Sequence, residues 1–404
     1  MEVDTVLTRR RAGIRALCVA LAGLVLAGVG FVAAPPADGA SPLSPPAIPP
    51  AGQAYLGAWV LPNGAGQYPF NARIQTELTN LGEFQAELGR PLGLVHVYQD
   101  WDEPMSNSLL NAISSTGAIP IIDWSCLSAS GKNGSTTAIK SGTFDSQIKA
   151  YAEQLKAYGK PVFLRWLWEQ NIDPPFGGAS KPSCDHTVGN TLTQDGKNYI
   201  AAWQHIWSIF KDPTTGVGAT NVSFVWNPGV AGNITPSVLQ GFWPGYHYVD
   251  WIGIDGYSRP GKQQLTCPSP INPNPTFAQL FAATGCTNLY TTLSGPQFAA
   301  SGPSGQPTLP MMIGETGATN QPNNPNHQRV YLEGNPGSIL EDFQANMFPD
   351  IRAISYYDGT NTQLGSNGTW SLSSQVAQGG TAPSGFGAFA ILAADPHFSY
   401  LDPG

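Results

Sequence analysis

The sequence predicts an α/β protein whose main domain is a single (β/α)8 TIM barrel. Eight short apolar runs recur along the chain, and several are nearly uninterrupted, as parallel strands covered on both faces are. Helix-like segments lie between them, usually ended by Gly or Pro. The alternation extends over about 350 residues, which suits a barrel of ~250 residues with insertions. A doubly wound open sheet is the alternative, but no Gly-rich phosphate loop follows the first run.

Each element can be placed in order along the chain. Strands are expected at 55–61, 92–101, 118–124, 161–169, 222–228, 249–257, 309–315 and 351–357. Helices are expected at 73–88, 106–116, 145–158, 194–210, 327–346 and 384–394. Functional side chains of this fold lie at the C-terminal ends of the strands, so the residues that end these runs are the candidates for a site.

Residues 1–39 are expected to form an export signal. Four arginines, the last of them Arg15, precede an uncharged run from Ala16 to Ala34, and Ala37-Asp38-Gly39 offers a small-x-small cleavage site. An uncleaved membrane anchor is the alternative, because a run of this length can nearly span a bilayer. The choice between Sec and twin-arginine export stays open. Cleavage predicts a secreted, extracellular protein.

Behind the signal, residues 40–53 form a proline-rich linker and residues 54–404 the barrel domain. The mature chain retains four cysteines, and an even count in an exported protein suggests two disulfides. Cys126–Cys184 together with Cys267–Cys286 is one possible pairing, which the sequence does not settle. There is no CxxC pair, which argues against a zinc site.

The composition excludes several classes of function. Charged residues are only 11% of the chain and the formal net charge is -8, which argues against a nucleic-acid partner. The 11 tryptophans and the low charge suit a protein that meets neutral polar ligands. No cofactor or metal is expected, and the six histidines are scattered with no metal-like pair. No G-x-S-x-G elbow is present, which argues against a serine nucleophile of that type.

Two acidic residues end strand-like runs in which neither has an obvious packing role. Glu169 ends the tryptophan-rich run LRWLWEQN, and Glu315 ends MMIGETG. The fourth and seventh strands of a barrel face each other across its mouth, so both carboxylates can reach one shared site. Retaining glycoside hydrolysis needs such a pair, with the two carboxyl groups about 5–5.5 Å apart.

Four short motifs, in order, match a known family. They comprise Arg165, Glu169 and Asn171 on the fourth strand, Val225-Trp226 on the fifth, Val249, Asp250, Gly253, Asp255 and Tyr257 on the sixth, and Glu315 and Gly317 on the seventh. With these motifs the chain resembles glycoside hydrolase family 26, a β-mannanase-rich family within the clan of retaining (β/α)8 glycosidases. That family usually has His directly before its acid/base, where this chain has Trp168.

The resemblance implies a role for each matched residue. Glu169 would be the general acid/base, Glu315 the nucleophile, and Tyr257 a hydrogen-bond donor to Glu315. The apolar surroundings of Glu169 favour its neutral form. Arg165 is expected inside the barrel, where it must pair with a carboxylate.

Aromatic and polar residues near strand ends complete the expected sugar-binding site. Aromatic rings stack on the C–H faces of sugars, and six aromatic residues end different strands: Trp59, Trp101, Trp124, Trp168, Trp226 and Tyr356. Asp123, Asn171 and Asn227 are expected to bond sugar hydroxyls, and His96 is another candidate neighbour. We therefore include Trp101, Asp123, Arg165, Trp168, Asn171, Trp226, Tyr356 and Tyr257 among the substrate-binding residues.

The sequence as a whole predicts a secreted, monomeric, retaining endo-β-glycosidase that hydrolyses a polysaccharide. The resemblance makes β-1,4-mannan the first candidate, followed by xylan, mixed-linkage glucan or a microbial envelope glycan. A non-catalytic carbohydrate-binding protein on the same barrel is an alternative of another class. A cell-surface structural protein held by the N-terminal segment is a third.

Overall fold

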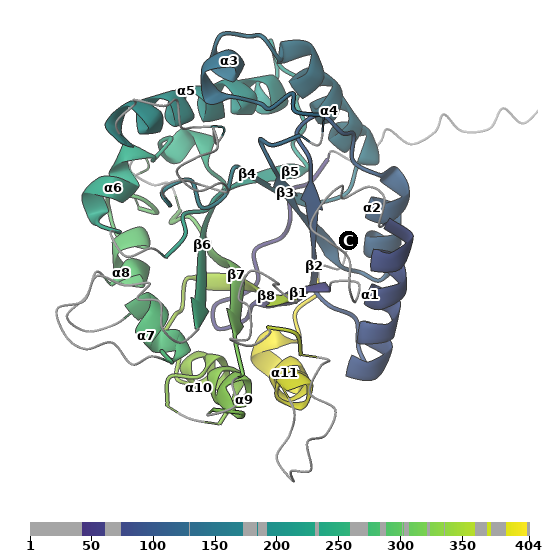
Figure 1. Cartoon of the computed structure of the whole chain (residues 1–404), viewed down its shortest axis with the longest axis vertical. Helices are drawn as coiled ribbons and strands as arrows, with labels where there is room; N and C mark the ends of the chain where they lie inside the picture. Colours follow the sequence, from purple (N-terminus) through teal and green to yellow (C-terminus); the bar gives the residue numbers. More distant parts are fainter. Residues whose placement is uncertain are drawn as a thin grey trace, which may run out of the picture. The chain divides into compact units, whose positions relative to one another are not determined.

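Eight parallel strands close into a barrel in the order β1 to β8, with β8 hydrogen-bonded back to β1 (Figure 1). The computed structural model describes residues 43–60, 74–128, 130–172, 184, 192–230, 234–258, 274–282, 288–300, 302, 307–320, 324–334, 336–359, 370–372 and 385–401. The strands are β1 Tyr55–Val60, β2 Leu94–Gln99, β3 Ile119–Trp124, β4 Val162–Trp166, β5 Val222–Trp226, β6 Trp251–Ser258, β7 Met311–Ala318 and β8 Ile351–Asp358. The predicted (β/α)8 barrel is confirmed.

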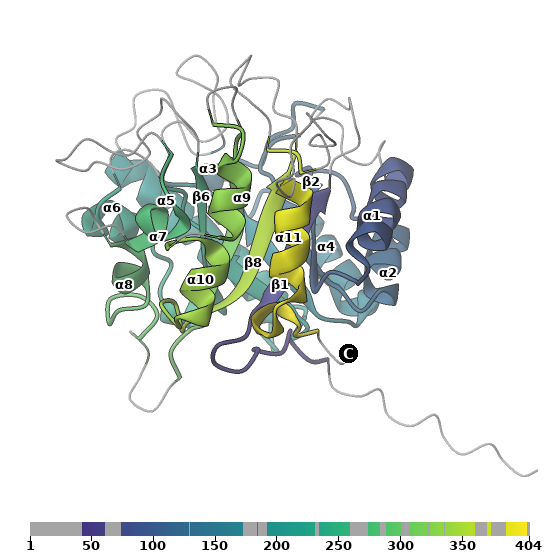
Figure 2. The ribbon, with the colours of Figure 1, turned by 90° about the horizontal axis from the view of Figure 1, so that it is seen from below.

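Helices surround the barrel, as Figures 1 and 2 show. They are α1 Ile74–Leu88, α2 Asn107–Ser115, α3 Thr136–Lys140, α4 Asp145–Tyr158, α5 Leu192–Lys211, α6 Pro236–Gly241, α7 Phe277–Ala282, α8 Leu289–Leu293, α9 His327–Leu332, α10 Ile339–Gln344 and α11 Gly385–Ala394. The single helix expected at 327–346 is two helices, because Gly334 and Gly337 between them both have φ of 89°. Short helices such as α3 and α8 were not predicted, since five residues carry too little periodicity.

Side chains alternate between the inside and the outside of the barrel along each strand. The lower interior is filled by a cluster of buried side chains: Tyr55, Leu94, Ile119, Ile121, Phe163, Val225, Trp251, Met312 and Ala353. This cluster lies on the N-terminal halves of most strands. These apolar side chains fill the lower part of the barrel. A functional site inside the barrel can therefore lie only above them, toward the C-terminal ends of the strands.

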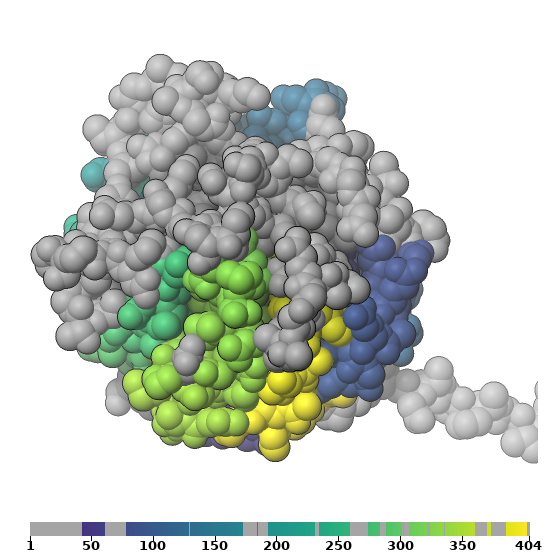
Figure 3. Space-filling model, turned by 60° about the horizontal axis from the view of Figure 1, so that its bottom comes forward, coloured from purple at the N-terminus to yellow at the C-terminus, as the bar shows by residue number. Residues whose placement is uncertain are grey.

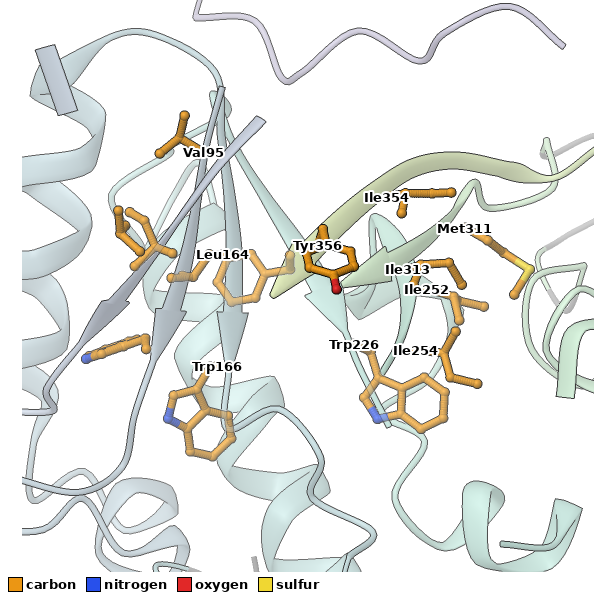
Figure 4. Close-up of a cluster of buried hydrophobic side chains, with 14 of the residues drawn as sticks. Val95, Leu164, Trp166, Trp226, Ile252, Ile254, Met311, Ile313, Ile354 and Tyr356 are labelled. Carbon is orange, nitrogen blue, oxygen red and sulfur yellow. The ribbon is translucent and has the colours of Figure 1, made fainter. Parts of the chain in front are cut away.

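The outward-facing side chains pack against the helices in a second, larger core. Figure 4 shows part of this layer, with Trp166, Trp226 and Tyr356 among aliphatic side chains of the strands. Helix-to-helix contacts extend it around the barrel. Phe84 of α1 packs edge-on against Phe386 and Phe389 of α11 at ring distances of 5.2 and 5.7 Å. Figure 3 shows α9 and α10, α11 and α1 side by side on this face.

The described part of the predicted linker, residues 43–53, packs across the N-terminal ends of the strands (Figure 2). The carbonyl of Leu43 accepts from Thr220 Oγ1 at 2.7 Å, just before β5. The carbonyl of Ala47 accepts from the Tyr55 hydroxyl at 2.9 Å, and that of Pro50 accepts from Arg352 at 2.9 Å. These proline-rich residues therefore cover the base of the barrel.

Cys126 and Cys184 form a disulfide with a Cα–Cα distance of 5.7 Å, which joins the segments that follow β3 and β4. This is one of the two bridges in the pairing suggested from the sequence. Cys267 and Cys286 lie outside the described residues, as does the expected export signal at 1–39. Among the helices of the described ranges, none combines the length and the apolar character needed to cross a bilayer.

Candidate active site

The carboxylate of Glu315 lies inside the upper barrel and is held by two tyrosines. Its side chain is almost fully buried. Tyr98 of β2 donates its hydroxyl to Oε1 at 2.9 Å, and Tyr257 of β6 donates a short hydrogen bond to Oε2. Each carboxylate oxygen therefore has its own phenolic donor.

Among the described residues, Arg165 of β4 is the only positively charged side chain that lies close to the Glu315 carboxylate. Its guanidinium lies 2.5 Å from Asp255 Oδ2, 3.3 Å from Asp123 Oδ1 and 3.6 Å from Glu315 Oε1. All four side chains are buried. Burial lowers the pKa of Arg165, but the three carboxylates outweigh it and raise that pKa above its ordinary value, so the guanidinium stays charged.

The strand register explains why these residues meet. Tyr98 pairs with Asp123, Asp123 pairs with Arg165, and Asp255 pairs with Glu315 on neighbouring strands. The β6–β7 pairing shifts register between Ile254 and Asp255, a bulge of the kind that re-aims side chains near functional sites. The bulge brings both Gly314 and Glu315 toward the interior.

Two glycines make room for the buried charges. A Cβ on Gly314 would lie 2.3 Å from Asn227 Oδ1 and 2.7 Å from Arg165 Cζ. A Cβ on Gly253 would lie 1.9 Å from the same Asn227 oxygen. Both distances are far below van der Waals contact, so β6 and β7 need glycine where the arginine and asparagine lie between them.

Glu169 lies in the turn after β4 rather than within the strand. It has φ of 56°, and Leu167 two residues earlier has φ of 48°, both in the left-handed region that side chains with a Cβ rarely adopt. The Glu169 amide donates to the Asn227 carbonyl at 2.7 Å. The Asn171 side chain then clamps Gly229 with two hydrogen bonds of 2.8 Å, to its carbonyl and from its amide.

The turn brings Glu169 to the same region as Glu315. A Cβ on Gly229 would lie 3.0 Å from Glu169 Oε1, so this glycine lets the carboxylate approach the end of β5. The charges of Glu169 and Glu315 both act on Asp255 and on Tyr257, raising their pKa values alongside the larger effect of burial. The two predicted catalytic residues therefore share neighbours on β6.

Burial sets the charge state of the group. It raises the pKa of Glu315, against the opposing effect of Arg165, and raises that of Asp123 to about 7. The pKa of Asp255 is raised well above its ordinary value for the same reason. Burial thus favours the protonated form of these three carboxyl groups, and the single guanidinium of Arg165 opposes it.

His96 of β2 is a neutral member of the group. Burial lowers its pKa to about 3, and its Nε2 lies 2.8 Å from Asp123 Oδ2. One ligand atom each from His96, Asp123 and Glu315 lies within 4.8 Å of the others, a spacing that could hold a metal ion. Arg165 already brings a positive charge to both carboxylates, which disfavours a divalent cation there, and we assign no metal.

No family model matches the chain. Endoglucanase H of Acetivibrio thermocellus is 34% identical over 208 residues, which are 50% of this chain and 20% of that protein. Beta-1,3-xylanase TXYA of a Vibrio species is 26% identical over 127 residues, 31% of this chain and 23% of that protein. The chain thus spans 20–23% of the length of these curated relatives.

Among solved structures, a Cellulomonas fimi endo-β-1,4-mannanase double mutant aligns with a TM-score of 0.52 at 12% identity, over 86% of this chain and 72% of that one. A modular endo-β-1,4-mannanase from C. fimi, described among the mannanases of glycoside hydrolase family 26, aligns with a TM-score of 0.49 at 13% identity, over 86% of this chain and 72% of that one. This chain is therefore similar in fold to a solved endo-β-1,4-mannanase. At these identities the likeness to solved structures concerns the fold alone.

The predicted site residues of this barrel divide into two sets. The first lies in or beside the Glu315 group: Asp123, Arg165, Trp168 and Tyr257. Asn171 belongs to neither set, because its side chain is bonded to Gly229 in the segment after β5. The Trp168 ring packs on Tyr98 at 5.4 Å, so the residue before Glu169 contacts a donor of Glu315. Trp59, also expected near the site, packs on Tyr98 at 4.8 Å and on Tyr357 at 4.4 Å.

The second set, Trp101, Trp226 and Tyr356, lies in the outer core instead. Trp101 stacks on Trp124 at 4.6 Å, and Trp226 stacks on Phe298 at 5.8 Å. Tyr356 packs on Phe389 of α11 at 5.9 Å. This placement corrects the expectation that they line the site. Trp101 lies beyond the end of its strand. Trp226 and Tyr356 each lie next to an inward-facing position, so the alternation of side chains along a strand turns them outward, toward the helices.

Several members of the group were not assigned a role from the sequence. Tyr98 contacts Glu315 directly, and Tyr357 and Trp370 pack on Tyr257 at 5.8 and 5.1 Å. The strand period of two could have placed Tyr98 and Tyr357 inside the barrel. Counting in steps of two from His96 reaches Tyr98, and counting from the inward Ala353 reaches Tyr357. Trp370 lies beyond β8, where no strand period applies.

Proposed function

We propose that this chain is a retaining endo-β-glycosidase in which Glu315 is the nucleophile and Glu169 the general acid/base. The observation that carries the proposal is the environment of Glu315. A buried carboxylate at a strand end, with a hydrogen-bond donor on each oxygen and a charged Arg165 3.6 Å away, is fixed in position by groups that stabilise its ionised form against the effect of burial. A purely structural carboxylate would not need a second carboxylate presented on a strained turn beside it.

The backbone around Glu169 supports the acid/base role. Left-handed conformations at non-glycine residues cost free energy and persist where the surrounding structure enforces them, often at functional sites. Here the amide of Glu169 and the side chain of Asn171 are both tied to the end of β5. The turn is therefore fixed in a form that presents Glu169 next to Gly229.

The proposed reaction is a double displacement. A Glu315 oxygen bonds to the anomeric carbon as the glycosidic C–O bond breaks, and Glu169 gives its proton to the leaving oxygen. Glu169 then takes a proton from water, whose oxygen displaces Glu315 and restores both carboxyl groups. Tyr98, Tyr257 and Arg165 stabilise the ionised Glu315 before attack.

The proposed substrate is a neutral β-linked polysaccharide, with β-1,4-mannan the first candidate. The mannanase structures that share this fold support mannan. The printed names of the sequence relatives, an endoglucanase and a β-1,3-xylanase, support a glucan or a xylan as the alternative. The rings of Trp59 and Trp168, which pack on Tyr98 next to Glu315, suit the faces of a sugar in each case. The predicted export signal supports action outside the cell.

The test is reducing-sugar release by the purified chain without its first 42 residues. The panel comprises β-1,4-mannan, β-1,4-xylan, β-1,3-xylan, mixed-linkage β-glucan and cellulose, with Glu169→Ala and Glu315→Ala as controls. Turnover of one polymer that is lost in both variants supports the proposal and fixes the substrate. Binding to a polymer without turnover, unchanged in both variants, would favour a carbohydrate-binding protein instead.

A further inference from the structure

The two oxygens of Glu315 have different neighbours. Oε1 accepts from Tyr98 at 2.9 Å and also faces Arg165 Nη2 at 3.6 Å and His96 Nε2 at 3.9 Å. Oε2 has Tyr257 as its donor. Oε1 thus has a phenol as its hydrogen-bond donor and a guanidinium nearby, whereas the donor to Oε2 among the described residues is the Tyr257 hydroxyl.

We propose that Tyr98 is a positioning residue that fixes Oε1 of Glu315, so that Oε2, on the Tyr257 side, is the oxygen that attacks the sugar. This inference rests on the proposed function and assigns a role within it. An oxygen held by a phenol and flanked by a guanidinium is poorly placed to turn toward a sugar. Oε2, which has the Tyr257 hydroxyl as its donor, keeps its second lone pair for the anomeric carbon.

The surroundings of Tyr98 make it a rigid anchor. Its ring is held between Trp59 at 4.8 Å, His96 at 4.7 Å and Trp168 at 5.4 Å. The pKa of its hydroxyl is raised well above the ordinary value, by burial first and then by Glu315, so it stays a proton donor. Three aromatic neighbours from β1, β2 and the β4 turn therefore fix where its proton points.

A lone pair of Oε2 forms the ester bond to the anomeric carbon while the bond from that carbon to the leaving oxygen breaks, and the leaving oxygen takes the proton of Glu169. Oε1 becomes the carbonyl oxygen of the ester and keeps the hydrogen bond from Tyr98. Tyr257 loses its ionic acceptor as Oε2 becomes an ester oxygen.

The first test is a Tyr98→Phe variant, which removes only the hydroxyl. The titratable and charged groups that face Glu315 are His96, Tyr98, Asp123, Arg165, Asp255 and Tyr257. Losing one donor to the carboxylate favours its protonated form, so the acid limb of the pH–rate profile should move to higher pH. We expect kcat to fall about 10- to 100-fold with little change in KM, as when a reacting group is misplaced.

Tyr151→Phe is the matched control. Tyr151 is a buried tyrosine of α4 that lies in the outer core, and its hydroxyl makes no hydrogen bond to any residue that the structure describes. Its variant should leave the acid limb in place. A Tyr98→Phe enzyme with an unshifted acid limb and normal kcat would overturn the inference while leaving the proposed function intact. Absence of turnover in the wild type on every polymer would instead count against the proposed function.

A second measurement does not depend on turnover. If Tyr98 stabilises ionised Glu315, Tyr98→Phe should cost more unfolding free energy at pH 8 than at pH 4, and Glu315→Gln should abolish that difference. A cost independent of pH in both backgrounds would show a packing role only and overturn the inference. For an active enzyme, the structure of a trapped 2-fluoroglycosyl ester decides the oxygen directly. The carbonyl oxygen should lie against Tyr98, and an ester oxygen there would contradict the assignment.

Discussion

The lower and upper halves of the barrel interior lie on the same strands but have opposite chemistry. The lower half is hydrocarbon and aromatic, with Phe163, Val225 and Met312 among its residues. Two residues further along β4 from Phe163, the interior position is Arg165, and the layer around it holds Asp123, Asp255 and Glu315. Burying three carboxylates around one cation costs desolvation free energy that hydrophobic side chains would not.

This difference indicates that the lower half of the barrel maintains the fold and that the upper half serves a function. A stable barrel could continue the lower pattern to its upper rim. Instead, the absence of a side chain at Gly253 and Gly314 makes room for the Asn227 amide and the Arg165 guanidinium, and Leu167 and Glu169 adopt left-handed backbone. Four local costs in one place indicate that the upper half is maintained for its chemistry.

The largest effect is expected from Glu315→Ala. Removing the proposed nucleophile should lower kcat by roughly 10⁴-fold or more, as loss of a nucleophile does in well-studied hydrolases. Azide added to the variant should restore turnover and give a glycosyl azide of inverted configuration. Hydrolysis at near wild-type rate, with circular dichroism unchanged, would remove Glu315 from the mechanism.

Replacement of the buried cation should have the next largest effect. Arg165→Met leaves Asp123, Asp255 and Glu315 without their counter-ion, and breaking a buried pair costs about 3–5 kcal/mol of unfolding free energy. Met312→Leu in the lower half is the matched control and should cost less than about 1.5 kcal/mol. Urea denaturation measures both, and equal losses would contradict the division between the two halves.

The sequence predicted the elements and the height of the site residues in the barrel, but not the direction of every side chain. The strands follow from long apolar runs, and helix α4 is found at the predicted residues, 145–158. Grouping Arg165, Glu169 and Glu315 required only strand ends and the barrel topology. Trp226 and Tyr356 were misplaced because a strand end fixes height but not direction, and only the period of two separates inside from outside. The bulge that turns Glu315 inward leaves no signal in the sequence.

The pH dependence of stability offers a smaller effect in the upper half. The pKa of His96 is lowered to about 3, so the unfolded chain binds its proton first and folding is weakened as pH falls below 6.5. Asp123 acts in the opposite sense, because its pKa is raised to about 7 and its protonation favours the folded state between pH 7 and 4.

His96→Gln should therefore remove the contribution of His96 to the pH dependence of the unfolding free energy and keep that of Asp123. Relative to the wild type, the variant should gain up to about 1.4 kcal/mol per pH unit as pH falls from 6.5, measured by urea unfolding at several pH values. Parallel stability curves for the two proteins would mean that His96 is not held neutral in the folded state.

The smallest effect tests the strained turn. Glu169→Gly should relieve the left-handed backbone and raise the free energy of unfolding by about 1 kcal/mol, while activity is lost. Glu169→Ala removes the same carboxylate but keeps the strain, so it serves as the control. If glycine and alanine give the same stability, the turn stores no strain.

The most direct test of the central claim is covalent trapping. The chain would be incubated with a 2-deoxy-2-fluoroglycosyl fluoride of the sugar in its best polymer, digested with pepsin, and analysed by mass spectrometry. The account predicts one added glycosyl group on the peptide that contains Glu315, and none in Glu315→Gln. A label on Glu169 or on any other residue, or turnover of the polymer with no trapped ester, would contradict it.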